Sequence, residues 1–379
     1  MTNINSLLSI LEYGSTCIRL AIYDKIALNK NLFFEEKVDF TRIENYSEDQ
    51  IISDIIKKAE KELGQHLNEI ILMVDNPSIF SLDFCIQKNF EKNIIKKEDI
   101  DYLINECKIQ VKINNMEKDI LHIIKSNLYF DDKLISETER LTQTASKVVV
   151  ETKFILIDKK FFQKIRDLFI KKHISLKSFF CISYIKSLGY IKKLEITGYN
   201  SFIDIGLNKS SLTIFKDSKL LYINNIHIGG DHITKDISKI LNINYRTAES
   251  KKLKFYKKNL NKGVLNEDEL LKKIINSRLE EIIEILFLNC PLVRAQLINS
   301  NLKLFFLGNG SKVLNENLLS FGSELKFINE MTIIDEKNFD CCNSAVEFNA
   351  SHMKIQPKKT SINLENKGFF EKLFEYFSK

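Results

Sequence analysis

The sequence has no tryptophan and only three prolines, and it lacks any long apolar run. No stretch reaches the roughly 18 apolar residues that a membrane-spanning helix needs, so no transmembrane segment is predicted. Residues 1–10 lack a basic cluster, and the apolar run at 7–11 is shorter than the hydrophobic region of a signal peptide. We therefore expect a chain that stays in the cytoplasm.

The seven cysteines are scattered, without a C-x-x-C pair and without histidine at zinc spacing. This scatter suits reduced thiols, so we predict neither a disulfide nor a structural metal. Lysine and arginine (56) outnumber aspartate and glutamate (50), which gives a net charge of +6. The lysines are spread along the whole chain and no nucleic-acid-binding motif accompanies them, so nucleic acid is not an expected partner.

The chain does contain enough apolar material for a large folded body. It is 44% hydrophobic and 28% charged, as is typical of globular proteins. At 379 residues it exceeds the size of one ordinary core, so a lobed or multidomain architecture is expected.

One strand–turn–strand pattern occurs twice. Residues 6–22 contain an apolar strand, a glycine turn and a second strand, and residues 200–215 repeat that order. Two such hairpins far apart in the chain predict two lobes with the same core topology, facing each other across a cleft. Between them, residues 84–158 combine a charged helical stretch with strands, which indicates a small α+β insert.

Four glycine-containing turns form the candidate ligand site. They are Glu12–Ser15, Asp204–Gly206, Gly229–Gly230 and Gly308–Gly310. Glycine turns at strand tips let backbone N–H groups approach a ligand, and a helix that follows adds its positive end, which suits phosphate oxygens. A single such turn is usually only a turn, so the prediction depends on the order and spacing of all four.

This order resembles the superfamily of actin and the sugar kinases, which carries two phosphate loops, one per lobe, and an adenosine loop near the end. Within it the sequence is similar to the FtsA family, bacterial division proteins that tie the tubulin-like FtsZ ring to the cytoplasmic membrane. Residues 227–237 (HIGGDHITKDI) closely follow the family signature P-x-G-G-x-x-(I/V)-T-x-D-(I/L), and residues 248–252 (AESKK) match A-E-x-x-K. The resemblance covers essentially the whole chain.

The resemblance implies an α/β, two-lobed actin-like ATPase (ribonuclease H-like) fold with an inserted α+β subdomain and a C-terminal amphipathic helix. It divides the chain into a first lobe (1–83 and 159–200), the insert (84–158), a second lobe with the adenosine loop (201–350), a linker (351–366) and the helix (367–379).

The resemblance also implies that the cleft binds ATP with Mg²⁺. In the first phosphate loop it assigns Gly14 and Ser15 to the nucleotide, and Glu12 stands where the family has a magnesium-orienting aspartate. In the second loop Asp204 and Gly206 match the family. Glu12 and Asp204 are therefore expected to hold magnesium through water.

Three residues of the second loop depart from the family pattern. Leu207 and Asn208 replace two glycines, and Lys209 replaces a threonine, so side chains stand where bare backbone is expected. We therefore expect nucleotide binding with little or no ATP hydrolysis.

The remaining nucleotide-binding residues that the resemblance implies are Gly229, Gly230, Glu249, Lys252, Gly308, Asn309 and Gly310. Glu249 and Lys252 are three residues apart and so share one helical face, which would be turned toward adenosine. In an arbitrary helix the same pair would simply be solvated.

The implied partners are the FtsZ C-terminal peptide, further copies of the chain in head-to-tail assembly, other division proteins and the cytoplasmic membrane. Arg278 aligns with a family arginine in the region that receives the FtsZ peptide, although a helical arginine alone would usually be solvated. The implied location is the cytoplasmic face of the bacterial inner membrane, at the division site.

Residues 367–379 have the pattern of a membrane-targeting amphipathic helix. One face, an arc of about 160°, carries Phe369, Phe370, Leu373, Phe374, Tyr376 and Phe377. The polar linker before it favours a detached element over a helix docked on the protein's own core.

Two other functions share parts of this pattern. A sugar-kinase-like phosphotransferase would need an intact catalytic aspartate between the lobes. An actin-like type IV pilus platform protein would share the lobes and the insert, but normally lacks such an anchor.

Overall fold

The computed structural model describes residues 7–24, 32–39, 47–136, 143–259, 267–293, 297, 300–314 and 325–355. The predicted helix at 367–379, with its six apolar residues, and the linker from 356 onward lie outside these ranges. Within them, no helix is both long enough and apolar enough to cross a bilayer.

The first lobe is built on a five-stranded sheet. Its strand order is β3 (Leu32–Asp39), β2 (Cys17–Asp24), β1 (Leu7–Tyr13), β4 (Glu69–Val74) and β9 (Ser175–Cys181). β1 and β2 form the predicted hairpin, with Leu11 opposite Leu20, and β4 and β9 add in parallel on the other side of β1. The helices of this lobe are α1 (Glu48–Leu63), α3 (Lys159–Ile170) and α4 (Ile182–Lys193).

The second lobe repeats this topology, as the two hairpins predicted. β10 (Tyr199–Ile205), β11 (Ser210–Lys216) and β12 (Lys219–Ile226) are antiparallel, and β13 (Leu302–Leu307) and β14 (Ile328–Ile333) extend the sheet in parallel from β10. Its helices are α5 (Gly230–Ile240), α6 (Tyr245–Asn259) and α7 (Glu267–Leu288), and a short 3-10 helix η4 (Asn309–Val313) follows β13. The prediction of two lobes with one core topology is confirmed.

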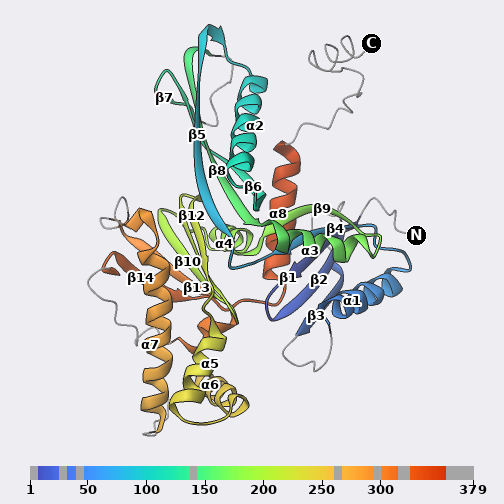
Figure 1. The fold of residues 1–379 in the computed structure, drawn as a ribbon, viewed down its shortest axis with the longest axis vertical. Coiled ribbons are helices and arrows are strands. Elements are labelled where there is room, and N and C mark those ends of the chain that lie inside the picture. The colour runs from blue at the N-terminus through green and yellow to red at the C-terminus, as the bar shows by residue number, and fades with distance from the viewer. Residues whose placement is uncertain are drawn as a thin grey trace.

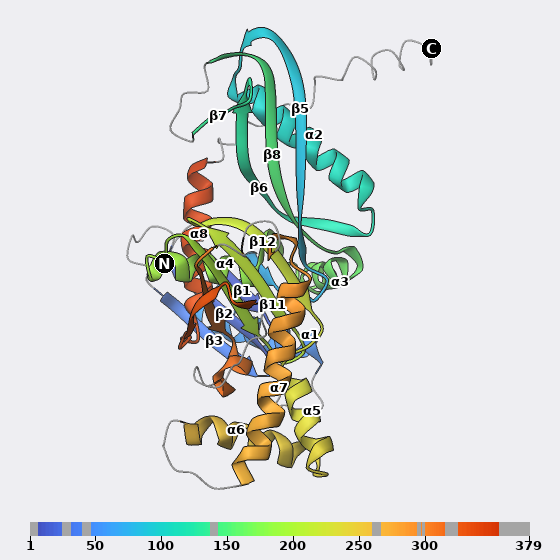
Figure 2. The same ribbon diagram turned by 90° about the vertical axis from the view of Figure 1, so that its left-hand side faces the viewer.

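The insert consists of β5 (Phe80–Ile94), α2 (Lys97–Asn114), β6 (Lys118–Phe130), β7 (Lys133–Leu134) and β8 (Thr144–Asp158). It begins four residues earlier than the sequence analysis placed it, because the long strand β5 already starts at Phe80. β5 pairs with β12 at Phe80 and Asn224, so the insert continues the sheet of the second lobe to nine strands. Figure 2 shows α2 lying across one side of these strands, at the end of the molecule opposite α6.

The insert is also fixed to the first lobe. Ile155 and Ile157, near the end of β8, belong to the hydrophobic core that contains the first sheet. His122 on β6 is buried, and its Nε2 accepts a hydrogen bond from the backbone N–H of Cys181 at 2.9 Å. The insert therefore contacts both lobes.

The chain returns to the first lobe after β14. Helix α8 (Asp340–Ile355) contributes Cys341, Cys342, Ala345 and Phe348 to the core that contains the first sheet and α4. The sequence analysis gave residues up to 350 to the second lobe and began a linker at 351. The structure corrects this, because the apolar face of α8 packs beside β1 and α4 and the helix continues to Ile355.

The helices α4 and α8 approach each other closely at Gly189. A Cβ added to Gly189 would lie 1.9 Å from Oγ and 2.6 Å from Cβ of Ser344. Glycine at this position lets the two helices pack at their crossing.

We expect Gly189→Ala to lower the free energy of unfolding by about 1–3 kcal/mol, because the new methyl group overlaps Ser344 and forces α4 and α8 apart. The measurement is urea denaturation of the full chain. Ser344→Gly removes the overlapping atoms, so the double variant should recover part of the loss. Strictly additive effects of the two substitutions would contradict the close packing.

Candidate functional site

The turn between β1 and β2 carries the first group of predicted site residues. The backbone N–H of Gly14 donates to the carbonyl of Cys17 at 3.1 Å, which closes the turn, and Ser15 stands exposed at its tip. Glu12 precedes the turn on β1 and is only 4% exposed, with Oε1 at 2.5 Å from Nη1 of Arg19. The predicted magnesium-orienting carboxylate is therefore paired with an arginine of the neighbouring strand.

The turn between β10 and β11 has the same hydrogen bonding. Gly206 donates its N–H to the carbonyl of Lys209 at 2.9 Å, as Gly14 does to Cys17 in the first turn. The two turns meet across the cleft, because a Cβ built on Gly206 would lie 3.5 Å from Oγ of Ser15. The structure thus brings the two predicted phosphate loops together.

The two glycines before α5 allow that helix to dock on the second turn. Gly230 and Asp231 donate their N–H groups to the carbonyls of Gly206 and Leu207, both at 2.8 Å. A Cβ on Gly229 would lie within 2.6 Å of the Leu207 carbonyl oxygen, so a side chain there would force α5 away. The first N–H groups of α5 are accordingly bound to protein carbonyls.

Glu249 and Lys252 lie on α6 and face α5. The Lys252 ammonium contacts the Gly230 carbonyl at 2.9 Å, Oγ1 of Thr234 at 2.6 Å and Oε2 of Glu249 at 2.7 Å. Lys252 is 6% exposed, whereas the Glu249 side chain is 31% exposed. Lys252 therefore joins α5 to α6, and Glu249 keeps part of its surface accessible.

The glycines at 308 and 310 pack against β10. Gly308 has φ of +85°, and a Cβ there would lie 2.3 Å from Oδ1 of Asp204. A Cβ added to Gly310 would lie 2.5 Å from Cγ2 of Ile205, so a side chain does not fit there. A Cβ added to Gly230 would lie 3.7 Å from Cα of Gly310. Asn309, at the start of η4, is exposed. The predicted adenosine loop is thus adjacent to the second turn and to the start of α5.

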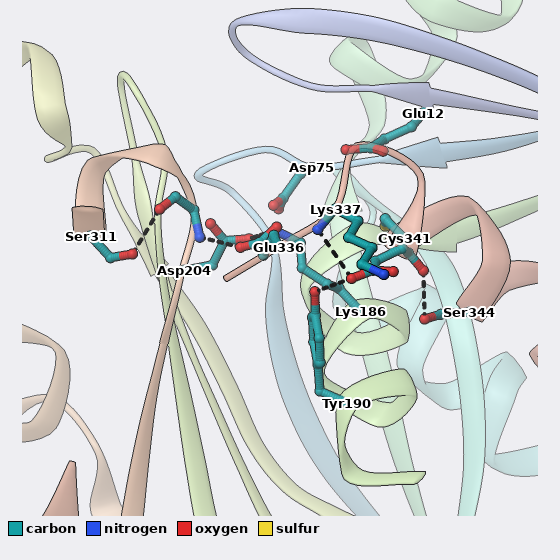
Figure 3. Close-up of polar contacts among 12 residues, drawn as sticks. Glu12, Asp75, Lys186, Tyr190, Asp204, Ser311, Glu336, Lys337, Cys341 and Ser344 are labelled. Atoms are coloured by element: carbon teal, nitrogen blue, oxygen red, sulfur yellow. Dashed lines mark hydrogen bonds and ion pairs between the residues drawn. The ribbon is translucent and has the colours of Figure 1, made fainter. Parts of the chain in front are cut away.

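A network of buried ion pairs crosses the cleft, and the sequence analysis missed most of it. Lys186 on α4 places its Nζ 2.6 Å from Oδ2 of Asp204 and 2.9 Å from Oε2 of Glu336, which follows β14. Lys209 forms an ion pair with Asp75, the residue that follows β4. Figure 3 shows Asp75, Asp204 and Glu336 approaching one another from three separate segments, near Lys186.

The charges of this network shift one another's pKa. Burial works against the charged form of Asp204, but Lys186 and Lys209 outweigh burial and leave the pKa of Asp204 below its ordinary value. Burial also disfavours the charged form of Lys186, and the carboxylates of Asp204 and Glu336 outweigh it, which raises the Lys186 pKa. For Glu12 and Asp75, burial dominates and raises the pKa.

The described residues do not form a direct metal site. No three histidine, cysteine, aspartate or glutamate side chains gather closely enough in the described ranges to hold a metal ion. Glu12 and Asp204, the predicted outer ligands of magnesium, are bonded to Arg19 and Lys186 respectively. The arrangement does not fit the predicted magnesium site.

Arg278 lies apart from the cleft network, on α7. Its Nε is 2.6 Å and its Nη2 is 3.0 Å from the carboxylate of Asp236 on α5, and its Nη1 pairs with Glu281. The predicted partner-binding arginine therefore links α5 to α7 and is 23% exposed in its side chain.

Comparison with known proteins finds similarity to cell division proteins. A family model described as cell division protein FtsA matches residues 201–285. FtsA proteins of two Helicobacter pylori strains are each 22% identical over 163 residues, which is 43% of this chain and 32% of the relative. The chain is FtsA-like. It spans about a third of the length of these curated relatives.

Solved structures show the fold. The chain is similar to the PilM–PilN type IV pilus biogenesis complex, with a TM-score of 0.58 and 14% identity over 93% of this chain and 99% of that one. MreB5 of Spiroplasma citri, bound to ADP, gives a TM-score of 0.50 and 11% identity over 93% of this chain and 99% of that one. This FtsA-like chain therefore has the actin-like ATPase fold that the sequence predicted.

We expect Asp204→Asn to lower the free energy of unfolding at pH 7 by about 2–4 kcal/mol, because Lys186 loses one of its two buried partners. A lowered carboxyl pKa contributes stability at neutral pH that is lost as the pH falls through the folded-state value. The difference between wild type and variant should therefore begin to shrink below about pH 4, where Asp204 of the unfolded chain takes up a proton, and should disappear only below the lowered pKa of folded Asp204. Urea denaturation of both proteins at a series of pH values measures this difference in the free energy of unfolding.

Asp54→Asn, on the exposed face of α1, is the matched control and should leave the free energy of unfolding unchanged at every pH of the series. A wild-type advantage over Asp204→Asn that stayed constant down to pH 3 would contradict the charged pairing.

Proposed function

We propose that this FtsA-like chain is an ATP-binding, actin-like adaptor that self-assembles and anchors the FtsZ ring to the cytoplasmic membrane during bacterial cell division. The observation that carries the proposal is the FtsA match over residues 201–285. That segment contains the second turn, the two glycines that dock α5, and the Glu249–Lys252 pair on α6.

Nucleotide binding is supported by the convergence of the predicted loops. Gly206, Gly230 and Gly310 lie close together, and Glu249 keeps an accessible carboxylate beside them. The glycines let the two turns, the start of α5 and the loop at 308–310 approach one another, as the order of loops implied by the family resemblance requires. We place ATP between the two turns, the start of α5 and the loop at Gly308–Gly310.

Hydrolysis is not part of the proposal. A general base or a water-positioning group must be free to act on the attacking water. The acidic residues of the described cleft are instead paired with lysine or arginine. The same pairing disfavours the kinase-like alternative.

Attachment to the membrane is proposed for residues 367–379. Burying one large apolar side chain fully is worth about 1.5–3 kcal/mol, and ordering each residue of the helix costs a comparable amount, so one such helix binds weakly. Several helices on one head-to-tail assembly would bind far more firmly through effective concentration. Self-assembly and membrane attachment are therefore coupled in this proposal, at the cytoplasmic face of the division site.

Arg278 is the proposed contact for the acidic FtsZ C-terminal peptide. Its guanidinium is already held by Asp236 and Glu281, so an incoming carboxylate would compete with these two partners. Charge complementarity between the Arg278 guanidinium and a carboxylate of the peptide would give the contact its specificity.

We expect Arg278→Glu to weaken binding of the FtsZ C-terminal peptide at least about tenfold, which corresponds to about 1.4 kcal/mol, because the new carboxylate joins two existing ones. Fluorescence anisotropy of a labelled peptide measures the affinity. Lys239→Glu, an equal charge change at the exposed end of α5, should leave it unchanged. Equal affinity of wild type and Arg278→Glu would remove Arg278 from the binding surface.

A second candidate function is an actin-like platform protein of a type IV pilus. The favouring observation is the similarity to the PilM–PilN complex, which extends over 93% of this chain and 99% of that one. The membrane segment separates the two candidates, because the pilus alternative does not require it.

We expect the full chain to float with liposomes that contain anionic lipid, and Phe374→Asp to reduce flotation several-fold, because a charge enters the apolar face. Ser378→Asp places the same residue on the polar face and should reduce it much less. Adding FtsZ should bring FtsZ into the floated fraction. Unchanged flotation of Phe374→Asp would argue against the anchor and favour the pilus alternative.

A further inference from the structure

The cleft between the lobes contains an unusual set of charges for a site that is expected to take magnesium. Four carboxylates enter it from four separate segments. They belong to Glu12, Asp75, Asp204 and Glu336. Three cationic side chains, those of Arg19, Lys186 and Lys209, are bonded to them.

Lys186 holds the centre of this set. It is 6% exposed, and its ammonium group lies between Asp204 and Glu336 at 2.6 and 2.9 Å. Glu336 also accepts a hydrogen bond from the backbone N–H of Gly308, so the loop at 308–310 is connected to the same set of charges. A cation of the chain thus lies directly in front of the predicted metal-orienting oxygens of Asp204.

Lys209 makes the second such pair, and it does so across the cleft. It stands on the second-lobe turn at the position where the family resemblance expects a small residue, and it is 6% exposed. Its ammonium group reaches Asp75 of the first lobe. Asn225 also donates to Asp75, at 3.4 Å.

Glu12 completes the set. Its Oε2 is buried and has no hydrogen-bond partner within the described ranges.

We propose that the ammonium groups of Lys186 and Lys209 replace the divalent cation in this cleft, so that it receives the phosphate groups of a nucleotide without Mg²⁺. The ligand in this proposal rests on the proposed nucleotide-binding function. The exclusion of the cation rests on the ion pairs alone.

The physical reason is a competition for space and charge. Mg²⁺ needs near-octahedral oxygen ligands and keeps several waters, and the ammonium groups occupy the carboxylate oxygens that would orient those waters. The three cations also offset three of the four carboxylates, so the set attracts a dication less strongly than unpaired carboxylates would. Lysine, in contrast, binds phosphate well as a point charge.

The first test is calorimetric titration of ATP into the full chain, once with excess MgCl₂ and once with excess EDTA. We expect the two dissociation constants to agree within about threefold, or the EDTA value to be the lower, because the lysines supply the positive charge. Binding that is at least about tenfold tighter with MgCl₂ would overturn the proposal.

The second test uses Mg²⁺ alone, without nucleotide. Lys186→Gln frees the carboxylates of Asp204 and Glu336, so we expect this variant to bind Mg²⁺ at least about tenfold more tightly than wild type. Lys235→Gln removes a lysine from a surface ion pair with Asp231 and serves as the control, with Mg²⁺ affinity equal to wild type.

If Lys186→Gln does not fold, Lys209→Gln supplies the same comparison by freeing Asp75. Equal Mg²⁺ affinity of wild type and the folded cleft variant would overturn the proposal. The absence of ATP binding in both buffers would remove the nucleotide-binding function instead, while a gain of Mg²⁺ binding in the variant would still support replacement of the cation.

Discussion

The ammonium group of Lys186, held between the carboxylates of Asp204 and Glu336, is the contact on which the arrangement of the lobes depends. Lys186 lies on α4, and its two partners come from β10 of the second lobe and from the segment after β14, so one buried cation joins elements that are distant in sequence. Charges removed from water are costly unless they are paired, and the pairing here raises the pKa of Lys186 and lowers that of Asp204, which favours the charged form of both. The adjacent pair of Lys209 and Asp75 extends the same principle across the cleft.

Around these ion pairs, glycines allow the backbone to come together. Gly229 and Gly308 each lie where a Cβ would meet a carbonyl or carboxylate oxygen of the second turn or of β10 at less than 3 Å. The α5 helix can then bind its first N–H groups to that turn. The ion pairs of Lys186 and the close backbone contacts of the glycines therefore hold the same segments together.

The architecture could be predicted well from the sequence, because the two hairpins and the glycine signature are local patterns. Gly14 and Gly206 lie in matching turns, and the two hairpins that contain them predicted two lobes with one core topology. The ion pairs could not be predicted in the same way. Asp75, Lys186 and Glu336 carry no motif, and only the return of the chain between the lobes brings them together.

The position of α8 illustrates the same limit. The sequence analysis assigned its residues to the second lobe and to a linker, because no local motif marks a return of the chain to the first lobe. The close packing of α8 against α4, where Gly189 faces Ser344, places α8 in the first lobe, and such a steric fit cannot be recognised from the spacing of residues in the sequence. Likewise Arg278 could be located on a helix, whereas its pairing with Asp236 depends on how α5 and α7 lie together.

The shared strand pairing between β12 and β5 has a mechanical consequence. The insert continues the sheet of the second lobe, yet the base of β8 is packed into the core of the first. Because the insert is joined to both lobes, a rotation of one lobe against the other would also have to move or strain the insert. The strands β5, β6 and β8 are long, so even a small rotation at their base would displace their far ends by a larger distance.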